Sequence, residues 1–553
     1  MHSDRSLSSL FRSVLLVALL GGATGCPGPK PDPDCENQPK GCEPSSNQDA
    51  GNTTDSGTHT PTDSGTGSGD AGQDAGTVDP ATTLVVTQVI SHYNRKGIEA
   101  VPRDFSQSPA ELFVLDGGVP VKFQGTAVAP GRMHFNVPPG EYFVKSSDTV
   151  YVLTTARTVD LGYRRFGRPD RGGNTVPVPT PPHPASLELS GLAPSPVPIE
   201  QYDYTLLFGS MDLEESGSFE LSQPIAAGQT TVVDRDAGYY TDWGSIPRYD
   251  PAQGDTAWVY QTMSHDAGVP ADGGQPYTYR TIVRAAHLNP FAFDGGTLTI
   301  KATLQPVPQQ EVLFEWRRDD FNALRSASLS GNPSAINDLT LYPTLKDARD
   351  GWVDYSVSSL LSFLPPSNDA QTLLVRRFTY GNPFPAGWEP TAEFTSVFFF
   401  TLTNHDGTRT VRASEQFLVN GPLGEITSAP VRPQLSLPQD FRVDGLPATT
   451  ARLMGTTTPM VTWGPSTLGL PTRYTLQVLR LTDSNRLTNV ARIHIGYNFK
   501  NVRLPFGLLT PGNTYVLRLT ARRGPEGMLE QPLLQYVTPY ATASTVSGLL
   551  TVP

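Results

Sequence analysis

The residues best suited to ligand chemistry are aromatic side chains clustered near the middle of the chain. Eight tyrosines and tryptophans fall between residues 239 and 279, and the candidate ligand-binding residues among them are Tyr239, Tyr240, Trp243, Tyr249 and Trp258. Acidic residues and arginines are interleaved with them. Exposed rings beside such groups bind sugars or peptides by stacking and hydrogen bonding. Tyrosine and tryptophan are also common in strands, so packing within a core is the competing and more favoured interpretation.

Local motifs for catalysis or metal binding are weak. The sequence contains no His-Glu-x-x-His, no phosphate loop and no dinucleotide fingerprint, and no histidine pair has helical spacing. Residues 234–238 partly resemble a calcium loop, but the position of Gly238 and the lack of a following glutamate do not fit an EF-hand. A solvated turn is the favoured interpretation there. We therefore expect no metal, no cofactor and no catalytic residue that a local motif identifies.

All three cysteines lie within the first 42 residues. Arg5 and Arg12 precede a short apolar run over residues 14–20, and small residues lead from there to Cys26. This order of charge, apolar run and small residues is typical of an export signal. A membrane-spanning helix needs about 20 apolar residues, so the run is too short to be one.

The same residues resemble the bacterial lipoprotein signal, in which the cysteine becomes the lipidated first residue of the mature protein. The resemblance implies a signal peptide over residues 1–25, lipidation of Cys26 and attachment to the membrane through the N-terminal lipid. Pro27 stands where an inner-membrane retention signal has aspartate, which implies the outer membrane, facing the periplasm or the surface. A plain secreted form is the alternative. Cys35 and Cys42 are then a candidate disulfide in an oxidising compartment.

A polar segment over residues 26–82 follows the export signal. Residues 51–77 contain no Leu, Ile, Phe, Tyr or Trp, so the segment is predicted to be a disordered linker. Residues 27–80 hold ten acidic residues and two lysines, and this segment carries most of the net charge of −12. The remaining chain is only weakly acidic and has no run of basic residues. We therefore expect no nucleic-acid partner.

From residue 83 onward, short alternating apolar runs are broken by Gly, Pro, Asn and Asp. This pattern predicts an all-β chain of tandem antiparallel β-sandwich domains. The expected domains are a β-sandwich over 83–170, β-rich domains over 185–310 and 311–435, and a final domain over 436–548, with a Pro-rich linker over 171–184. A single larger domain over 185–435 is the alternative. At most a short helix is expected, near residues 356–363.

Two of these domains resemble known families. In the last domain, Trp463, Leu509 and Tyr515 lie within strand patterns that resemble the fibronectin type III module. The resemblance implies that Trp463 packs in the centre of the sandwich and that Leu509 and Tyr515 form a tyrosine corner. In the first domain, residues 131–144 place a Pro-Gly turn before an aromatic strand and resemble the carboxypeptidase-regulatory or transthyretin-like sandwich. Both families imply spacer or binding modules rather than catalysis.

These features favour a lipid-anchored protein of the cell envelope. Its sandwich modules would serve adhesion, scaffolding or the binding of a glycan or protein ligand, without catalysis. The alternative is an exported carbohydrate-active enzyme whose catalytic domain lies within 185–435. Such an enzyme would need paired carboxylates facing an aromatic cleft.

Overall fold

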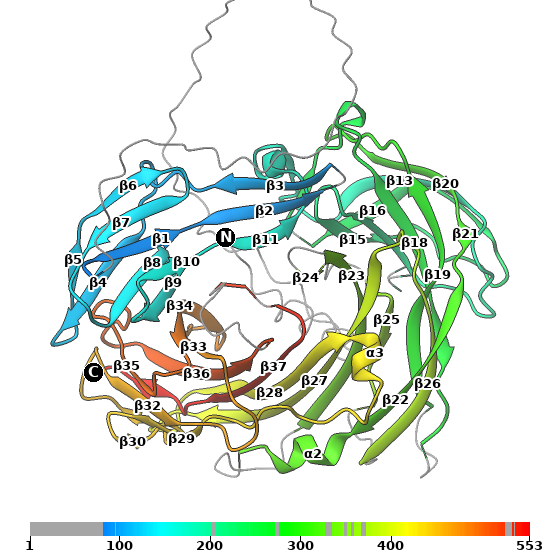
Figure 1. Ribbon diagram of the computed structural model, residues 1–553. Coiled ribbons are helices and arrows are strands. Elements are labelled where there is room, and N and C mark those ends of the chain that lie inside the picture. Colours follow the sequence, from blue (N-terminus) through cyan, green and yellow to red (C-terminus); the bar gives the residue numbers. More distant parts are fainter. Residues whose placement is uncertain are drawn as a thin grey trace, which may run out of the picture. The chain divides into compact units, whose positions relative to one another are not determined.

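Strands make up most of the regular structure of the protein, and its few helices are short (Figure 1). The computed structural model describes residues 81–553 except residues 95, 202, 204, 243, 271–275, 327–333, 348–350, 355–358, 367–371, 526–533 and 536. The predicted signal peptide, Cys26, Cys35, Cys42 and residues 27–80 lie outside the described residues. The described part belongs to one compact unit, Asp79–Pro553. Its helices are short, and none of them is long and apolar enough to cross a membrane. The predicted all-β class is confirmed.

The first module is a two-sheet sandwich. One sheet has the order β10-β1-β7-β6, and the strands of the facing layer pair in the order β5-β4-β8-β9. Buried side chains such as Leu84, Leu112 and Phe135 fill the space between them. The strands are β1 (Thr83–Thr87), β4 (Glu111–Asp116), β5 (Val119–Phe123), β6 (Gly125–Ala129), β7 (Arg132–Asn136), β8 (Tyr142–Ser147), β9 (Val150–Thr154) and β10 (Thr158–Asp160). A separate three-stranded sheet contains β2 (Val89–Asn94), β3 (Gly97–Pro102) and β11 (Tyr163–Phe166).

The second module is a strongly curled sheet around its own core. Its strands pair in the order β20-β13-β16-β15-β14-β18-β19. They are β13 (His183–Ser190), β14 (Leu206–Ser210), β15 (Glu215–Glu220), β16 (Thr231–Thr241), β18 (Ala257–Asp266), β19 (Thr278–Leu288) and β20 (Leu298–Thr303). The range 171–184, predicted as a linker, holds the end of the 3-10 helix η1 (Pro169–Gly173), the start of β13, and β12 (Thr175–Pro177), which pairs with β17 (Ser245–Pro247). A second 3-10 helix, η2 (Pro251–Gln253), precedes β18.

The third region is built on long strands. The longest, β27 (Trp388–Thr403), pairs with β23 (Ser334–Asp347) on one side and β28 (Thr410–Pro422) on the other. The other elements are β21 (Gln305–Pro306), β22 (Gln309–Arg317), α2 (Arg318–Ala323), β24 (Gly351–Asp354), β25 (Leu361–Phe363), β26 (Leu373–Gly381) and α3 (Leu423–Ile426). A short helix was expected near residues 356–363. For residues 361–363 this prediction is wrong, because they form strand β25, which pairs with β19 and β23.

The last module is again a sandwich. One sheet has the order β30-β29-β32-β35, and β34, β33, β36 and β37 form the other layer. The backbone N–H of Thr510 donates to the Tyr515 hydroxyl over 2.8 Å, which confirms the predicted tyrosine corner. Trp463 is buried and its ring centroid lies 5.3 Å from that of Tyr474. The strands are β29 (Gln439–Val443), β30 (Leu446–Pro447), β31 (Arg452–Leu453), β32 (Met460–Gly464), β33 (Arg473–Leu481), β34 (Leu487–Gly496), β35 (Asn501–Arg503), β36 (Thr514–Arg523), β37 (Tyr540–Val546) and β38 (Leu550–Thr551).

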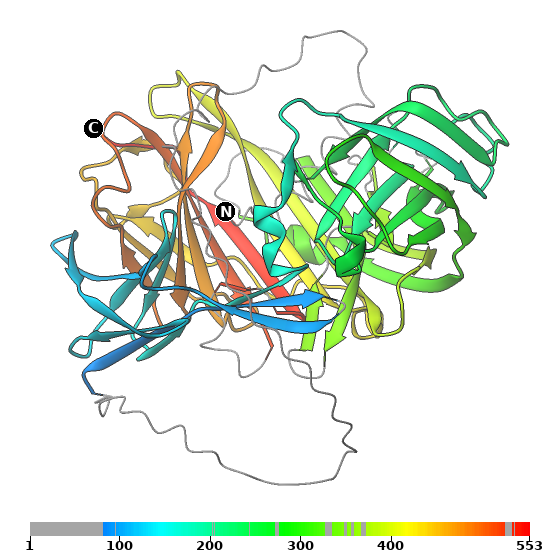
Figure 2. The ribbon, with the colours of Figure 1, turned by 90° about the horizontal axis from the view of Figure 1, so that it is seen from above.

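Strand pairing also joins the modules to one another. β37 pairs with β36 of its own sandwich and with β28 of the preceding region, so one sheet runs on from β27 to β33. In Figure 2 the red β37 lies between the orange and the yellow strands. Residues 150–153 of β9 pair in parallel with residues 492–495 of β34. The first and last modules therefore share a sheet although some 340 residues separate these segments.

Candidate functional site

The structure separates the aromatic residues predicted to bind a ligand. Tyr239 and Tyr249 are buried and pack around Phe208 in the core of the second module. Tyr240 is 36% exposed, and Trp258 is half-buried. Trp243 lies outside the described residues. The competing interpretation, packing in a core, therefore holds for Tyr239 and Tyr249, and the binding role of Tyr240 and Trp258 stays a prediction.

Trp258 lies at an open groove of about 520 Å³ between β19, β20 and residues 382–383, which follow β26. The exposed imidazole of His287, directly opposite on β19, stacks on the indole with 4.4 Å between ring centroids. Prolines and aliphatic side chains form much of the remaining lining: Pro306, Pro308, Pro383, Leu288 and Ala302. The groove has an aromatic platform, and its lining contains no carboxylate. We call it the Trp258 groove.

The enzymatic alternative requires two carboxylates that face an aromatic cleft. The Trp258 groove offers the aromatic rings without the carboxylates. A second cavity of this module, about 460 Å³, is lined by Glu220 and Asp236 but by no Tyr, Trp or Phe. These two cavities give the enzymatic alternative no support, and it stays a prediction.

The predicted turn at residues 234–238 is wrong, because these residues lie inside strand β16. The carboxylate of Asp234 is buried and accepts hydrogen bonds from the backbone N–H and hydroxyl of Ser222, each over 2.7 Å, and from the backbone N–H of Asp236. It stabilises a bulge at which β16 changes its register against β13. Among the described residues, no group of three or more His, Cys, Asp or Glu side chains is placed to hold a metal ion.

Arginines and carboxylates meet where the first module joins the second. Arg165 on β11 and Arg171 on η1 both donate to Glu214, with N–O distances of 2.9 and 3.2 Å. Arg168 donates to Asp255 over 3.1 Å. The three arginines come from one short segment and the carboxylates from the second module. We call these residues, with Glu215, the junction cluster. It holds the two modules together by charge.

Glu215 is the most deeply buried member of the junction cluster, with no exposed surface. One carboxylate oxygen accepts hydrogen bonds from the hydroxyls of Tyr239, over 2.9 Å, and Thr241, over 2.7 Å. Arg171 lies 3.8 Å from the other oxygen. Burial removes water from the carboxylate and raises the pKa of Glu215 to about 8, although these partners act in the opposite direction. Burial likewise raises the pKa of Asp255. Sequence inspection missed this cluster, although the four arginines in residues 164–171 and the paired Glu214-Glu215 were a usable signal.

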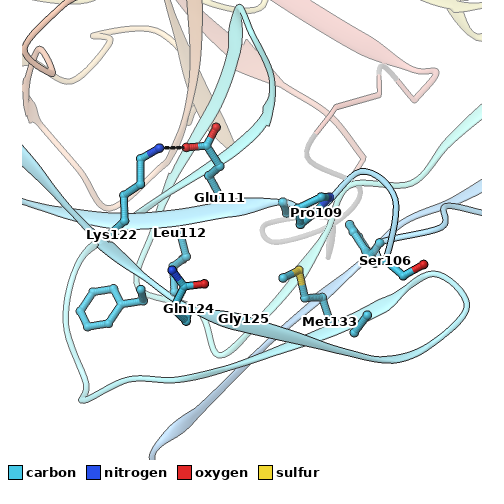
Figure 3. Close-up of a pocket in the computed structure, with 12 residues that line it drawn as sticks. Ser106, Pro109, Glu111, Leu112, Lys122, Gln124, Gly125 and Met133 are labelled. Carbon is cyan, nitrogen blue, oxygen red and sulfur yellow. Dashed lines mark ion pairs between the residues drawn. The ribbon is translucent and has the colours of Figure 1, made fainter. Parts of the chain in front are cut away.

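The first module has a cavity of about 440 Å³ at the open side of its sandwich (Figure 3). Buried Phe105, Leu112 and Met133 supply its apolar floor. Lys122 and Glu111 form an ion pair at its rim, apart from Met133. No sequence motif marked this cavity, because its walls come from five separate segments of the module. We call it the β6 cavity after the strand at its mouth.

Comparisons with known proteins show no family for this chain. No family model matches it, and no curated protein matches it. Among solved structures, the crystal structure of the chicken CNTN1 FN1-FN3 domains is similar at 10% sequence identity, covering 66% of this chain and all of that chain, with a TM-score of 0.13. A TM-score of that size carries no argument about function.

Proposed function

We propose that this chain is an exported, lipid-anchored protein of the outer membrane whose fibronectin type III-like and related β-sandwich modules form a non-catalytic scaffold for adhesion or ligand binding. The observation that carries the proposal is the joining of modules by strand pairing. β9 pairs with β34, and β28 pairs with β37. The junction cluster adds ion pairs at a third boundary. A chain built in this way holds surfaces from distant modules in fixed relative positions.

The anchor is tested by replacing the lipidated cysteine in the full chain. Cys26→Ala removes the thiol that is proposed to carry the lipid. Cys35→Ala is the matched control, because it removes another thiol from the same polar segment. We expect an alkyne-tagged fatty acid to label the parent chain and Cys35→Ala, but not Cys26→Ala. We also expect Cys26→Ala to leave the membrane fraction. Unchanged labelling and membrane association of Cys26→Ala would contradict the anchor.

The binding role is tested at the Trp258 groove with a glycan. Aromatic ring pairs in proteins contribute about 0.5–1.5 kcal/mol in addition to the free energy of burying their surface. We take the same range for the binding free energy of a sugar that stacks on this aromatic platform. We expect polysaccharides from the cell envelope to retard the parent chain in affinity electrophoresis, and His287→Ala to weaken that retardation several-fold. Tyr497→Ala is the control, because Tyr497 is an exposed aromatic residue in the last module. Equal retardation of parent and His287→Ala would remove the groove from the proposal.

A further inference from the structure

Strand β6 is the outermost described strand of its sheet, and its register against β7 shifts once, at a bulge between Ala127 and Ala129, so that Gly125–Ala127 is its regular part. Among the described residues it pairs with β7 alone. Its sequence, Gly-Thr-Ala-Val-Ala, contains neither charge nor proline, and Val128 is 47% exposed. The neighbouring edge strand β5, by contrast, carries Pro120 and Lys122. Natural proteins commonly use such residues to prevent strand addition. The regular part of the β6 edge, Gly125–Ala127, is therefore open to an added strand, and the bulge that follows it limits the addition to that part.

The ladder of the sheet fixes which backbone groups point outward. The N–H of Val137 donates to the carbonyl of Thr82 over 2.7 Å, and hydrogen-bonded pairs alternate along antiparallel strands. Phe135 and Met133 therefore direct their backbone groups towards β1, and His134 pairs through hydrogen bonds with Thr126. It follows that Gly125 and Ala127 direct their N–H and C=O groups away from β7.

The β6 cavity lies beside these same two residues. Gly125 and Ala127 both line it, together with Met133, which is directly opposite Ala127 on β7. Residues opposite one another share a face of the sheet, so side chains of an added strand opposite Gly125 and Ala127 would lie on the cavity side. A side chain at Gly125 itself would clash, because its Cβ would lie 2.5 Å from the ring of Phe135 and 2.4 Å from the methyl group of Met133. The glycine therefore lets the side chains of Phe135 and Met133 pack directly against β6, beside the cavity.

We propose that the β6 edge binds an extended peptide of a partner protein by strand addition, with an apolar side chain entering the β6 cavity. Backbone hydrogen bonds would supply affinity and the cavity would supply specificity. The molecule already uses this kind of contact, because four residues of β9 are covered by β34 through strand pairing. This inference rests on the proposed binding function and specifies its ligand as an extended peptide. Its binding to purified protein is independent of lipidation, so this inference and the Cys26 experiment can fail separately.

The test uses the full chain and a displayed library of seven-residue peptides. We expect selection to enrich peptides with an apolar residue at one fixed position. Ala127→Pro removes the outward N–H at a position where an edge strand tolerates proline, and should weaken the selected peptide at least about tenfold. Ala127→Ser keeps the N–H and should bind within about twofold of the parent. Unfolding curves establish that both variants are folded.

A second measurement makes the result independent of those variants. Methylating alternate backbone nitrogens of the selected peptide should abolish binding for one alternate set and leave the other set unaffected, which only strand pairing produces. Failure to enrich any peptide, or equal binding to parent and Ala127→Pro, would overturn the inference. Self-association of the free chain that Ala127→Pro abolishes would assign the edge to a second copy and would also overturn it.

Discussion

The buried carboxylate of Glu215 should make the stability of the second module depend on pH in an unusual direction. The pKa of Glu215 is about 8 in the folded protein, against an ordinary value of 4.5. The folded state therefore holds this proton more tightly than the unfolded state. The contribution of Glu215 to stability is complete below pH 4.5, falls as the pH rises and is lost above pH 8. Most buried carboxylates that are paired with a cation give the opposite trend.

The magnitude follows from the size of the pKa difference. At 1.36 kcal/mol per unit, the shift corresponds to about 5 kcal/mol between the protonated and ionised forms. Glu215→Gln removes the ionisation and keeps an oxygen that can accept the hydrogen bonds of Tyr239 and Thr241. We expect this variant to resemble the parent near pH 5 and to be more stable by several kcal/mol near pH 9, with about 5 kcal/mol as the upper limit.

Urea unfolding followed by tryptophan fluorescence between pH 5 and 9 measures this difference. Glu188→Gln is the matched control, because Glu188 lies in the same module but its side chain is 58% exposed. It should stay within about 0.5 kcal/mol of the parent throughout. If Glu215→Gln keeps the full pH dependence, the proton belongs to another buried group, such as Asp338, whose pKa burial raises to about 7. If the variant is clearly less stable at pH 8, Glu215 is ionised and stabilised by Arg171.

Two further predictions concern the positions where the fold allows least change. Tyr515→Phe removes the acceptor for the Thr510 N–H and should destabilise the last module by ~1–3 kcal/mol in urea unfolding. Gly217→Ala should be more damaging, because a Cβ there would lie 2.2 Å from the carbonyl oxygen of Tyr240 on the neighbouring strand. The strands must separate to admit the methyl group, so we expect a loss of ~3 kcal/mol or more, measured as a lower unfolding midpoint.

Each of these two predictions has a matched control in the chain. Tyr497→Phe removes the same hydroxyl from a residue that is 43% exposed, so it should change stability by less than about 0.5 kcal/mol. Gly173→Ala adds the same methyl group where nothing lies within 4 Å, and should be nearly neutral. A Tyr515→Phe variant as stable as Tyr497→Phe would show that the tyrosine corner contributes nothing. A neutral Gly217→Ala would contradict the close strand contact.

The features predictable from the sequence are those that local pattern determines. The sequences of β33 and β36 alternate apolar and polar residues with the two-residue repeat of a strand, although most residues of both strands are buried, and the spacing of Leu509 and Tyr515 is a local signature. Both are therefore visible without a fold. The aromatic residues were harder, because clustering in sequence does not determine which face of a strand a ring occupies. Tyr239 and Tyr240 are adjacent, yet one is buried and the other is exposed.

The pairing between modules was not predictable, because it depends on the register between distant strands. Nothing in residues 150–153 distinguishes an outer strand from one that is covered by β34. The junction cluster shows the same limit, since Arg165 and Glu214 are 49 residues apart and meet only once two modules are placed. The β6 edge is a third case. Its lack of charge is visible in the sequence, but its outermost position in the sheet is not.

The two kinds of contact between modules have different physical consequences for a scaffold. Strand pairing fixes distance and direction together, because each hydrogen bond has a narrow range of geometry. Buried ion pairs add little net stability, but the loss of one partner leaves a buried charge, which costs several kcal/mol. Together they make a sliding or rotated arrangement of neighbouring modules unfavourable. Modules separated by exposed linkers would move independently. In this chain the Trp258 groove and the β6 edge, the two proposed binding places, instead belong to one compact unit.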